Sequence, residues 1–273
     1  NLERVGIITR LVGSKAASVN PMYLDATATM QQEGVSISPI VLAQKAGKKG
    51  KIDWRMCMDL SRQNKREKKA TYRSPTLQEL REVAQDSNSY FVLDLMKGYF
   101  QIPLAEESKK HFVFICPLGE GNAKFQLNRV PMGGLNSAPH LQQCMESLLG
   151  NIKGIGCYQD DILGCAKTST SHVEKLRTVF SRLQEKGLKL QLEKVTLWAR
   201  EVVFVGHKFT KDGCTADPSK VEALVNMGKP KTVGELSLFS HSSGFLRPYV
   251  MKFAELVAPI NEYMTEVLKD CPK

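Results

Sequence analysis

The chain has 273 residues, of which 42% are hydrophobic, so it can bury a sizeable core in one large domain or in two to three subdomains and is not expected to be disordered. Its 38 lysines and arginines against 28 aspartates and glutamates give a formal net charge of +10, which favours nucleic acid as a partner, with an acidic membrane surface as the alternative. No run of 18 apolar residues occurs and no signal peptide is visible, so the sequence predicts no transmembrane helix.

The seven cysteines form neither a CxxC pair nor a cluster with histidine at zinc-binding spacing. Several lie inside apolar stretches, which is typical of buried free thiols and indicates a reducing, cytoplasmic compartment. The five histidines are scattered, and we interpret them as structural or surface residues. The chain begins at Asn1 without a methionine, which we interpret as the start of a processed or trimmed product.

Residues 1–34 give no clear element and are treated as an N-terminal segment of uncertain structure. Residues 38–42 and 54–60 are then predicted to be strands, joined by a turn over residues 44–51 that is rich in glycine and lysine. Taken alone, such a turn is usually a solvated loop, and the same holds for the charge run 65–69.

A helix is predicted to begin with Ser74 as its N-cap and Pro75 as its first helical residue. The apolar run 90–95 follows, with Asp94 near its end. Its neighbours on both sides are apolar, so amphipathic alternation does not explain this charge. The ordinary interpretation is an aspartate in a turn or on an edge strand, and the functional one is a metal ligand.

Residues 111–116 and 124–130 predict a strand pair bridged by a turn that contains Gly119 and Gly121. A loop over residues 131–139 follows, whose glycines allow the backbone to approach a ligand closely. Residues 139–149 predict a helix, and its apolar face is formed by Leu141, Met145 and Leu148.

Residues 156–163 predict a strand, a tight turn and a second strand, with Asp160 and Asp161 at the turn. The ordinary interpretation is that aspartate is a common turn residue. Two adjacent like charges near a core are costly, however, unless a divalent cation binds them. If the strand that carries Asp94 pairs with this hairpin, three carboxylates converge on a site for two metal ions.

The last third of the chain predicts helices around one hairpin. A helix is expected from N-cap candidates at residues 168–171 to Gly187, and it is followed by a hairpin at residues 201–209, for which the ordinary interpretation is a plain hairpin closed at Asp212-Gly213. Asp217 and Pro218 predict the start of another helix, and residues 232–235 have the pattern of a capping box.

Several of these stretches carry a family resemblance. Residues 158–161 (YQDD) are similar to the YxDD motif of reverse transcriptases, and residues 91–102 resemble the LDLKSGYxQI block of gypsy-class long-terminal-repeat retrotransposons and their retroviral relatives. Residues 54–60 resemble WRxCxDxRxLN, residues 131–139 resemble PFGLxNAP with one extra residue and Met132 in place of Phe or Gln, and residues 201–209 resemble EVxFLGH. The resemblance covers roughly residues 35–260.

The resemblance implies an α+β, right-hand polymerase fold with a palm sheet, β-rich fingers and a helical thumb. The fingers are expected at residues 35–85 and 105–138, the palm at 86–104 and 139–213, and the thumb at 214–273. The RNase H domain of the family is expected to be absent from this chain.

The resemblance also implies the site residues. Asp94, Asp160 and Asp161 are expected to be catalytic and to hold two Mg²⁺ ions, or Mn²⁺ as the alternative, with the backbone carbonyl of Leu95 as a further ligand. The residues expected to contact the incoming nucleotide are Arg55, Lys48, Leu95, Tyr99, Met132 and Gly133. Gly206 and His207 are expected to grip the primer.

The implied function is DNA synthesis on an RNA or DNA template by extension of a primer 3′-hydroxyl with dNTPs, without a membrane partner, in the cytoplasm or within a virus-like particle. One alternative is a captured fold that binds nucleic acid or protein without catalysis. Another is an RNA-dependent RNA polymerase, against which Tyr99 speaks, because a bulky aromatic in this position of the family lies beneath the sugar and excludes a 2′-hydroxyl.

Overall fold

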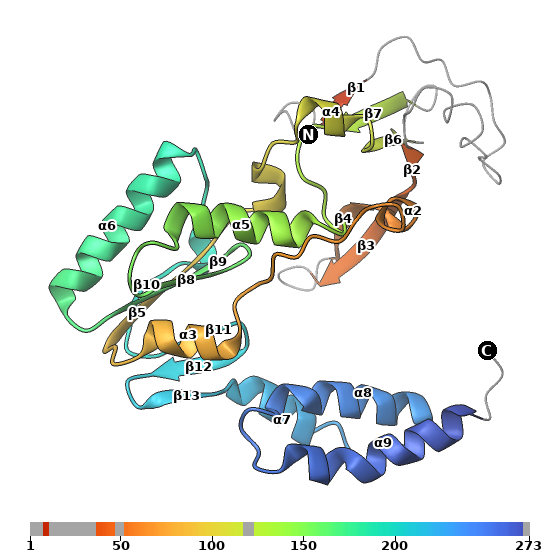
Figure 1. The fold of residues 1–273 in the computed structure, drawn as a ribbon, viewed down its shortest axis with the longest axis vertical. Helices are drawn as coiled ribbons and strands as arrows, with labels where there is room; N and C mark the ends of the chain where they lie inside the picture. Colours follow the sequence, from red (N-terminus) through yellow and green to blue (C-terminus); the bar gives the residue numbers. More distant parts are fainter. Residues whose placement is uncertain (1–7, 11–36, 47–51, 117–122, 270–273) are drawn as a thin grey trace.

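The computed structural model describes residues 8–10, 37–46, 52–116 and 123–269. Four antiparallel strands form the central layer, which we call the palm sheet (Figure 1). Their spatial order is β10 (Thr196–Ala199), β5 (Ser89–Asp94), β9 (Asp161–Ala166) and β8 (Ile155–Tyr158). Strands far apart in the sequence therefore lie side by side in this sheet.

Both faces of the palm sheet are covered, which explains why the interior of β5, residues 90–93, is apolar. Phe91 and Leu93 pack on one face with helices α5 (Ser137–Leu149) and α6 (Ser169–Glu185). Tyr90 packs on the other face with helix α3 (Leu77–Ala84) and the strands that follow the palm sheet. The buried position of Asp94 at the end of β5 is set by this packing.

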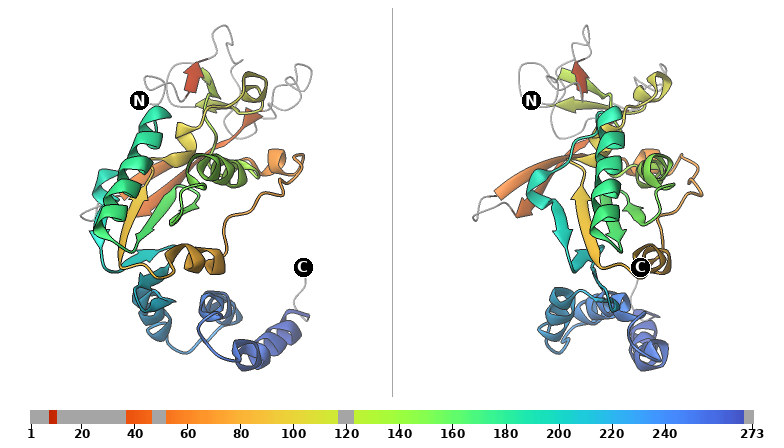
Figure 2. Two further views of the ribbon diagram at one scale, coloured as in Figure 1. Left: turned by 60° about the vertical axis from the view of Figure 1, so that its left-hand side comes forward. Right: turned by 90° about the vertical axis from the view of Figure 1, so that its left-hand side faces the viewer.

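The fingers strands form two further sheets at one end of the molecule (Figure 2). One sheet has the order β1 (Ile8–Arg10), β7 (Ala123–Leu127), β6 (Val113–Cys116) and β2 (Ile37–Ser38), and the other is the hairpin of β3 (Ile40–Ala46) and β4 (Ile52–Met58). Short helical turns complete this region at α2 (Ser61–Asn64), η3 (Gly98–Gln101) and α4 (Glu106–Lys109). Met58, Leu60 and Phe114 belong to its buried core.

Turn η4 (Leu192–Lys194) leads into β10, the last strand of the palm sheet, and the chain then leaves the palm through a three-stranded sheet of β11 (Val202–Phe204), β12 (His207–Thr210) and β13 (Gly213–Ala216). Thumb elements α7 (Pro218–Val225), α8 (Val233–Ser243), η5 (Gly244–Leu246) and α9 (Phe253–Lys269) then lie at the end of the molecule opposite the fingers (Figure 2). None of the helices within the described ranges is long and apolar enough to span a bilayer.

Most helix boundaries follow the predicted capping residues. Thr168 caps α6 by accepting a hydrogen bond from Ser171 N, and Gly187 follows the end of that helix with a φ of +68°. Asp217 caps α7, with Pro218 as the first helical residue. Thr232 caps α8, but the carboxylate of Glu235 accepts a hydrogen bond from Lys231 N, so only half of the predicted capping box forms.

The predicted start of helix α3 is wrong by two residues. The helix begins at Leu77, with Thr76 as its N-cap, and not after Ser74. The Thr76 hydroxyl accepts a hydrogen bond from Glu79 N, and the Glu79 carboxylate accepts one from Thr76 N, which is a complete capping box. This reciprocal pair satisfies two backbone donors and therefore outweighs the preference of Pro75 for the first helical position.

Candidate active site

The three predicted catalytic carboxylates lie at one end of the palm sheet. Strands β5 and β9 pair as predicted, with Asp94 directly opposite Asp161, and the turn of Gln159 and Asp160 joins β8 to β9. Leu95 N donates a hydrogen bond to the Asp160 carbonyl over 2.9 Å, which ties this turn to the end of β5. The fold therefore brings Asp94 and Asp161, 67 residues apart in the sequence, onto neighbouring strands.

Full ionisation of all three carboxyl groups is electrostatically unfavourable at this sheet end. Burial raises the pKa of Asp161 to about 6, and the adjacent carboxylates of Asp160 and Asp94 add to this rise. Burial, followed by the charge of Asp94, also raises the pKa of Asp160. These pKa shifts mean that negative charge at this sheet end needs a cationic partner.

Lys194 supplies one such charge and was not singled out from the sequence. Its Nζ lies 2.5 Å from Asp94 Oδ2, and the hydrogen bond to Asp94 raises the pKa of the lysine. The lysine side chain is 54% exposed while that of Asp94 is only 12% exposed, so the ion pair is open on the lysine side. Nothing in the sequence near Lys194 marks it, because its partner is 100 residues away.

Carboxylate oxygens are the ligands that Mg²⁺ and Mn²⁺ prefer. In the part of the chain that the structure describes, however, no three side chains of His, Cys, Asp or Glu form a preassembled metal site. A hydrogen bond between the side chains of Asp94 and Asp161 contributes to the raised pKa of Asp161, and Asp94 Oδ2 is turned to Lys194.

Tyr99 and Leu95 lie beside the carboxylates. Tyr99 is half-buried on η3, and its hydroxyl donates a 2.9 Å hydrogen bond to Gln159 Oε1 in the carboxylate turn. Burial, followed by the charge of Asp160, raises the pKa of Tyr99. Leu95 is buried and pairs with Leu190 across an isolated bridge. Tyr99 is thus a packed aromatic that also has a polar partner in the turn.

The loop with Met132 and Gly133 is fastened by a residue that the sequence did not reveal. Asn64 Nδ2 donates to the Gly133 carbonyl over 2.9 Å, and Asn64 Oδ1 accepts from Leu135 N over 2.9 Å. Gly133 is exposed and has a φ of +87°, a backbone conformation that glycine adopts without strain, whereas Met132 is half-buried. Helix α2, which ends at Asn64, therefore fixes the conformation of this loop.

Arg55 and Lys48 are the remaining residues expected to contact the nucleotide. Arg55 lies on β4 opposite Ala43. Lys48 lies outside the described residues. Their contacts with a nucleotide stay predictions.

The hairpin with Gly206 and His207 faces the thumb. Val205 and Gly206 form its turn, both with positive φ, and the His207 side chain is buried. His207 Nδ1 lies 2.7 Å from the Tyr249 hydroxyl, and its ring stacks on that of Phe245 with centroids 4.8 Å apart. The His207 side chain thus joins the hairpin to the thumb, and the Gly206 carbonyl in the turn accepts a 3.0 Å hydrogen bond from Asp217 N at the start of α7.

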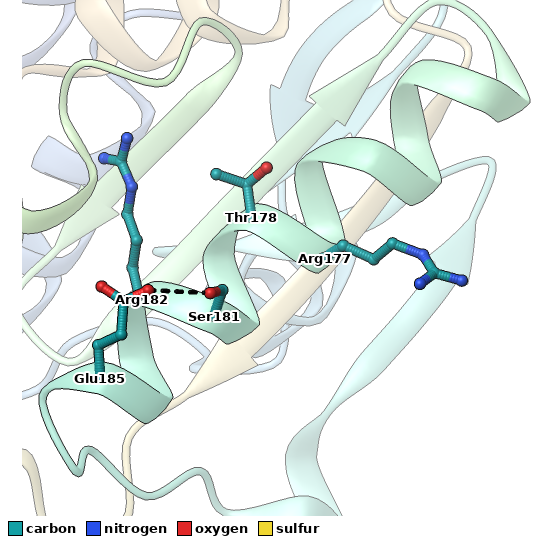
Figure 3. A pocket seen from close by; sticks show the side chains of 5 residues that line it. All are labelled: Arg177, Thr178, Ser181, Arg182 and Glu185. Atoms are coloured by element: carbon teal, nitrogen blue, oxygen red, sulfur yellow. Dashed lines mark hydrogen bonds between the residues drawn. The ribbon is translucent and has the colours of Figure 1, made fainter.

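A shallow pocket on helix α6 lies apart from these residues (Figure 3). Arg182 is one of its lining residues, and its guanidinium donates a 2.7 Å hydrogen bond to the Leu148 carbonyl. Ser181 donates to the Glu185 carboxylate over 3.0 Å, and Arg177 points away from this group (Figure 3). No predicted site residue lines the pocket, and Thr178 and Arg182 bond to residues outside its lining.

Comparisons with known proteins agree with this geometry. The family described as reverse transcriptase (RNA-dependent DNA polymerase) matches residues 45–209. The retrovirus-related Pol polyprotein from transposon 297 of Drosophila melanogaster is 29% identical over 231 residues, which cover 84% of this chain and 21% of that protein. The transposon Tf2-3 polyprotein of Schizosaccharomyces pombe is 26% identical over 236 residues, which cover 86% of this chain and 17% of that protein.

Solved structures of the foamy viral protease-reverse transcriptase have the same fold. Its complex with an RNA/DNA hybrid matches with a TM-score of 0.75 at 25% identity and covers 96% of this chain and 36% of that one. Its complex with double-stranded DNA matches with a TM-score of 0.74 at 25% identity, over 96% of this chain and 56% of that one. The right-hand arrangement expected from the sequence is confirmed, and the chain spans about a fifth of the length of the curated relatives it matches.

Proposed function

The chain belongs to the reverse transcriptase (RNA-dependent DNA polymerase) family, and we propose that it extends the 3′-hydroxyl of a primer with dNTPs on an RNA or DNA template. The observation that carries this proposal is the register of the palm sheet, in which Asp94 lies opposite Asp161 beside the turn of Asp160. A polymerase needs carboxylates gathered where a primer end and a triphosphate meet, and this sheet end supplies them.

The residues present fit a divalent metal. All three candidate side chains are hard carboxylate ligands, and the raised pKa of Asp161 indicates that a further cation near it is favourable. In this proposal Asp94, Asp160 and Asp161, with the Leu95 carbonyl, hold two Mg²⁺ ions, with Mn²⁺ as an alternative. When bound, such ions lower the pKa of the attacking hydroxyl and offset charge on the phosphates.

The chain's own residues then position the reactants. The nucleophile is the primer hydroxyl, so no side chain needs to form a covalent intermediate. Tyr99 lies below the incoming sugar and disfavours a 2′-hydroxyl, and the loop with Met132 and Gly133 approaches the nucleotide with its backbone. Arg55 and Lys48 bind its phosphates.

The template and primer are bound mainly through their phosphates. Support comes from the net charge of +10 and from the foamy viral relatives, which were solved with an RNA/DNA hybrid and with double-stranded DNA. The turn of Val205 and Gly206 offers backbone groups to the primer end, while the buried side chain of His207 keeps that turn against the thumb.

Primer extension on an RNA template and on a DNA template, with dNTPs and Mg²⁺, tests the proposal. We expect the wild-type chain to extend both primers and Asp160→Asn to lose extension while it keeps duplex binding and thermal stability, because only the charge of one ligand is removed. Asp212→Asn is the matched control, since this aspartate is exposed at the β12–β13 turn.

Three outcomes would contradict the proposal. If the wild-type chain binds a primer–template duplex but extends nothing, it is a captured, non-catalytic module. If Asp160→Asn extends at the wild-type rate, the carboxylate assignment is wrong. Equal use of rNTPs and dNTPs by the wild type would instead favour an RNA polymerase.

A further inference from the structure

A buried amide lies directly beneath the carboxylate turn. Gln142, on the second turn of helix α5, has none of its surface exposed to solvent. Its Nε2 donates to the Cys157 carbonyl over 2.8 Å and to Glu146 Oε1 over 2.6 Å, and its Oε1 accepts from Gln159 N over 2.7 Å. Both amide hydrogens and the amide oxygen are therefore used, as the burial of such a group requires.

The chemistry of its partners fixes how this amide is oriented. A backbone carbonyl can only accept and a backbone N–H can only donate, so Gln142 must point its nitrogen to Cys157 and its oxygen to Gln159. Cys157 and Gln159 stand on either side of Tyr158, at the point where β8 passes into the turn. Gln142 thus bridges the last part of the strand and the first residue of the turn.

Gln159 in turn has two roles that depend on its position. Its backbone is left-handed, with a φ of +54°, and it directly precedes Asp160. Its side-chain oxygen accepts the hydrogen bond from the Tyr99 hydroxyl. One residue therefore connects the buried amide to a carboxylate on one side and to the Tyr99 ring on the other.

We propose that Gln142 is a positioning residue that holds Gln159 in place and thereby fixes the Tyr99 ring, so that it contributes to the choice of deoxyribonucleotides over ribonucleotides. This rests on the proposed polymerase function. Gln142 touches no reactant and acts through Gln159. A ring held at both its packed edge and its hydroxyl excludes a 2′-hydroxyl better than a ring free to move away.

The network also extends towards the fingers. The Glu146 carboxylate, which accepts from Gln142, accepts a second hydrogen bond from the Tyr72 hydroxyl. Tyr72 lies in the segment between α2 and α3. Because hydrogen-bonded chains are coupled, loss of the Tyr72 hydroxyl is expected to weaken the hold on Gln159 in a milder way than loss of Gln142 itself.

The test compares Gln142→Met with Gln143→Met. Methionine keeps the length of the side chain but none of its three hydrogen bonds, and Gln143 is the exposed neighbour on the same helix. Single-nucleotide incorporation gives kcat/KM for a dNTP and for the matched rNTP. We expect the ratio of these two values to fall by about tenfold in Gln142→Met and to stay at the wild-type value in Gln143→Met.

Two further variants support the reading if Gln142→Met does not fold. Gln159→Asn retains a residue that tolerates left-handed backbone but is too short to reach Tyr99, and we expect the same fall in the ratio. Tyr99→Phe removes the hydroxyl that donates a hydrogen bond to Gln159, and we expect this change alone to lower the ratio. If Gln142→Met does fold, combining it with Tyr99→Phe should give a non-additive change, because both act through Gln159.

Hydrogen exchange separates this proposal from the proposed function. The Gln159 amide should exchange slowly in the wild type and in Gln143→Met, and rapidly in Gln142→Met. An unchanged discrimination ratio in folded Gln142→Met and in Gln159→Asn overturns the specificity role, and a slow Gln159 amide in Gln142→Met overturns the positioning role. If the wild type extends no primer at all, the polymerase function fails, and the exchange data still decide whether Gln142 holds the turn.

Discussion

Gly98 is a point at which the palm leaves little room around the turn of Gln159 and Asp160. A Cβ atom at this position would lie 2.7 Å from the Asp160 Cβ and 3.5 Å from Leu141 Cδ2. The Asp160 Cβ cannot swing aside by changing rotamer, because it is bonded directly to the backbone of a turn that Leu95 N holds by its carbonyl. Gly98→Ala must therefore displace the turn itself or the start of η3.

The size of the effect follows from this contact. The two Cβ atoms must separate by roughly 0.7 Å before they reach the 3.4 Å at which ordinary contact begins. Overpacking a site of this kind costs about 1–3 kcal/mol, and the lower chain entropy of unfolded alanine offsets about 0.4–1 kcal/mol. We expect a net loss of about 1–2 kcal/mol of unfolding free energy. A shift near 1 Å at reacting groups can lower a rate by about 100-fold.

The assay pairs urea unfolding with single-nucleotide incorporation. We expect Gly98→Ala to unfold at lower urea with an unchanged m-value and to incorporate dNTP at least about tenfold more slowly, with little change in duplex affinity. Gly244→Ala in η5 is the matched control, because a Cβ there meets nothing within 4 Å. Wild-type stability and rate in Gly98→Ala would refute the reasoning, since they would mean that the turn yields without cost.

Two more predictions concern charges. Lys194→Met should lower the unfolding free energy by about 1 kcal/mol without Mg²⁺, because it leaves the buried Asp94 unpaired. In thermal unfolding, Mg²⁺ should then stabilise this variant more than it stabilises the wild type. Equal stabilisation of the two proteins would count against metal binding beside Asp94. Burial, then the charges of Lys220 and Arg81, lowers the pKa of His207, so NMR titration should give a midpoint below its ordinary value of about 6.5. As the pH falls, His207 is protonated in the unfolded chain before it is protonated in the folded one. Its contribution to the unfolding free energy is therefore complete above about pH 6.5 and is lost as the pH falls towards the pKa of His207 in the folded state. His207→Gln should make the unfolding free energy less dependent on pH in this range.

The palm could be predicted from the sequence because its signals are local. The apolar runs around Asp94 and around Asp160 and Asp161 are long enough to be strands buried on both faces, and a charge at their ends then has few explanations. The start of α3 was missed although its signal is also local. Thr76 and Glu79 have capping-box spacing, but the Ser74-Pro75 pair offers a competing start two residues earlier, and only the folded backbone decides between them.

The contacts of the site residues could not be predicted, because they join parts of the chain that are far apart in the sequence. Lys194 meets Asp94, Asn64 holds the loop at Gly133, and His207 packs against Tyr249. Each of these side chains is chemically ordinary in its local sequence. What makes it part of the site is the tertiary arrangement, and periodicity, capping and spacing carry no information about that.

Several unfavourable features of the fold lie at the end of the palm sheet where the carboxylates are. Lys97 and Gln159, two of the described non-glycine residues with left-handed backbone, stand beside Gly98 and Asp160 respectively. The pKa of Asp161 is raised to about 6 at the same place. Strained backbone and crowded charge reduce stability, and they persist where the surrounding structure holds them for a ligand. Left-handed backbone alone does not mark the site, because Asp86, Val205 and Lys252 share it; what marks this sheet end is that left-handed backbone occurs there together with buried carboxylates whose pKa values are raised.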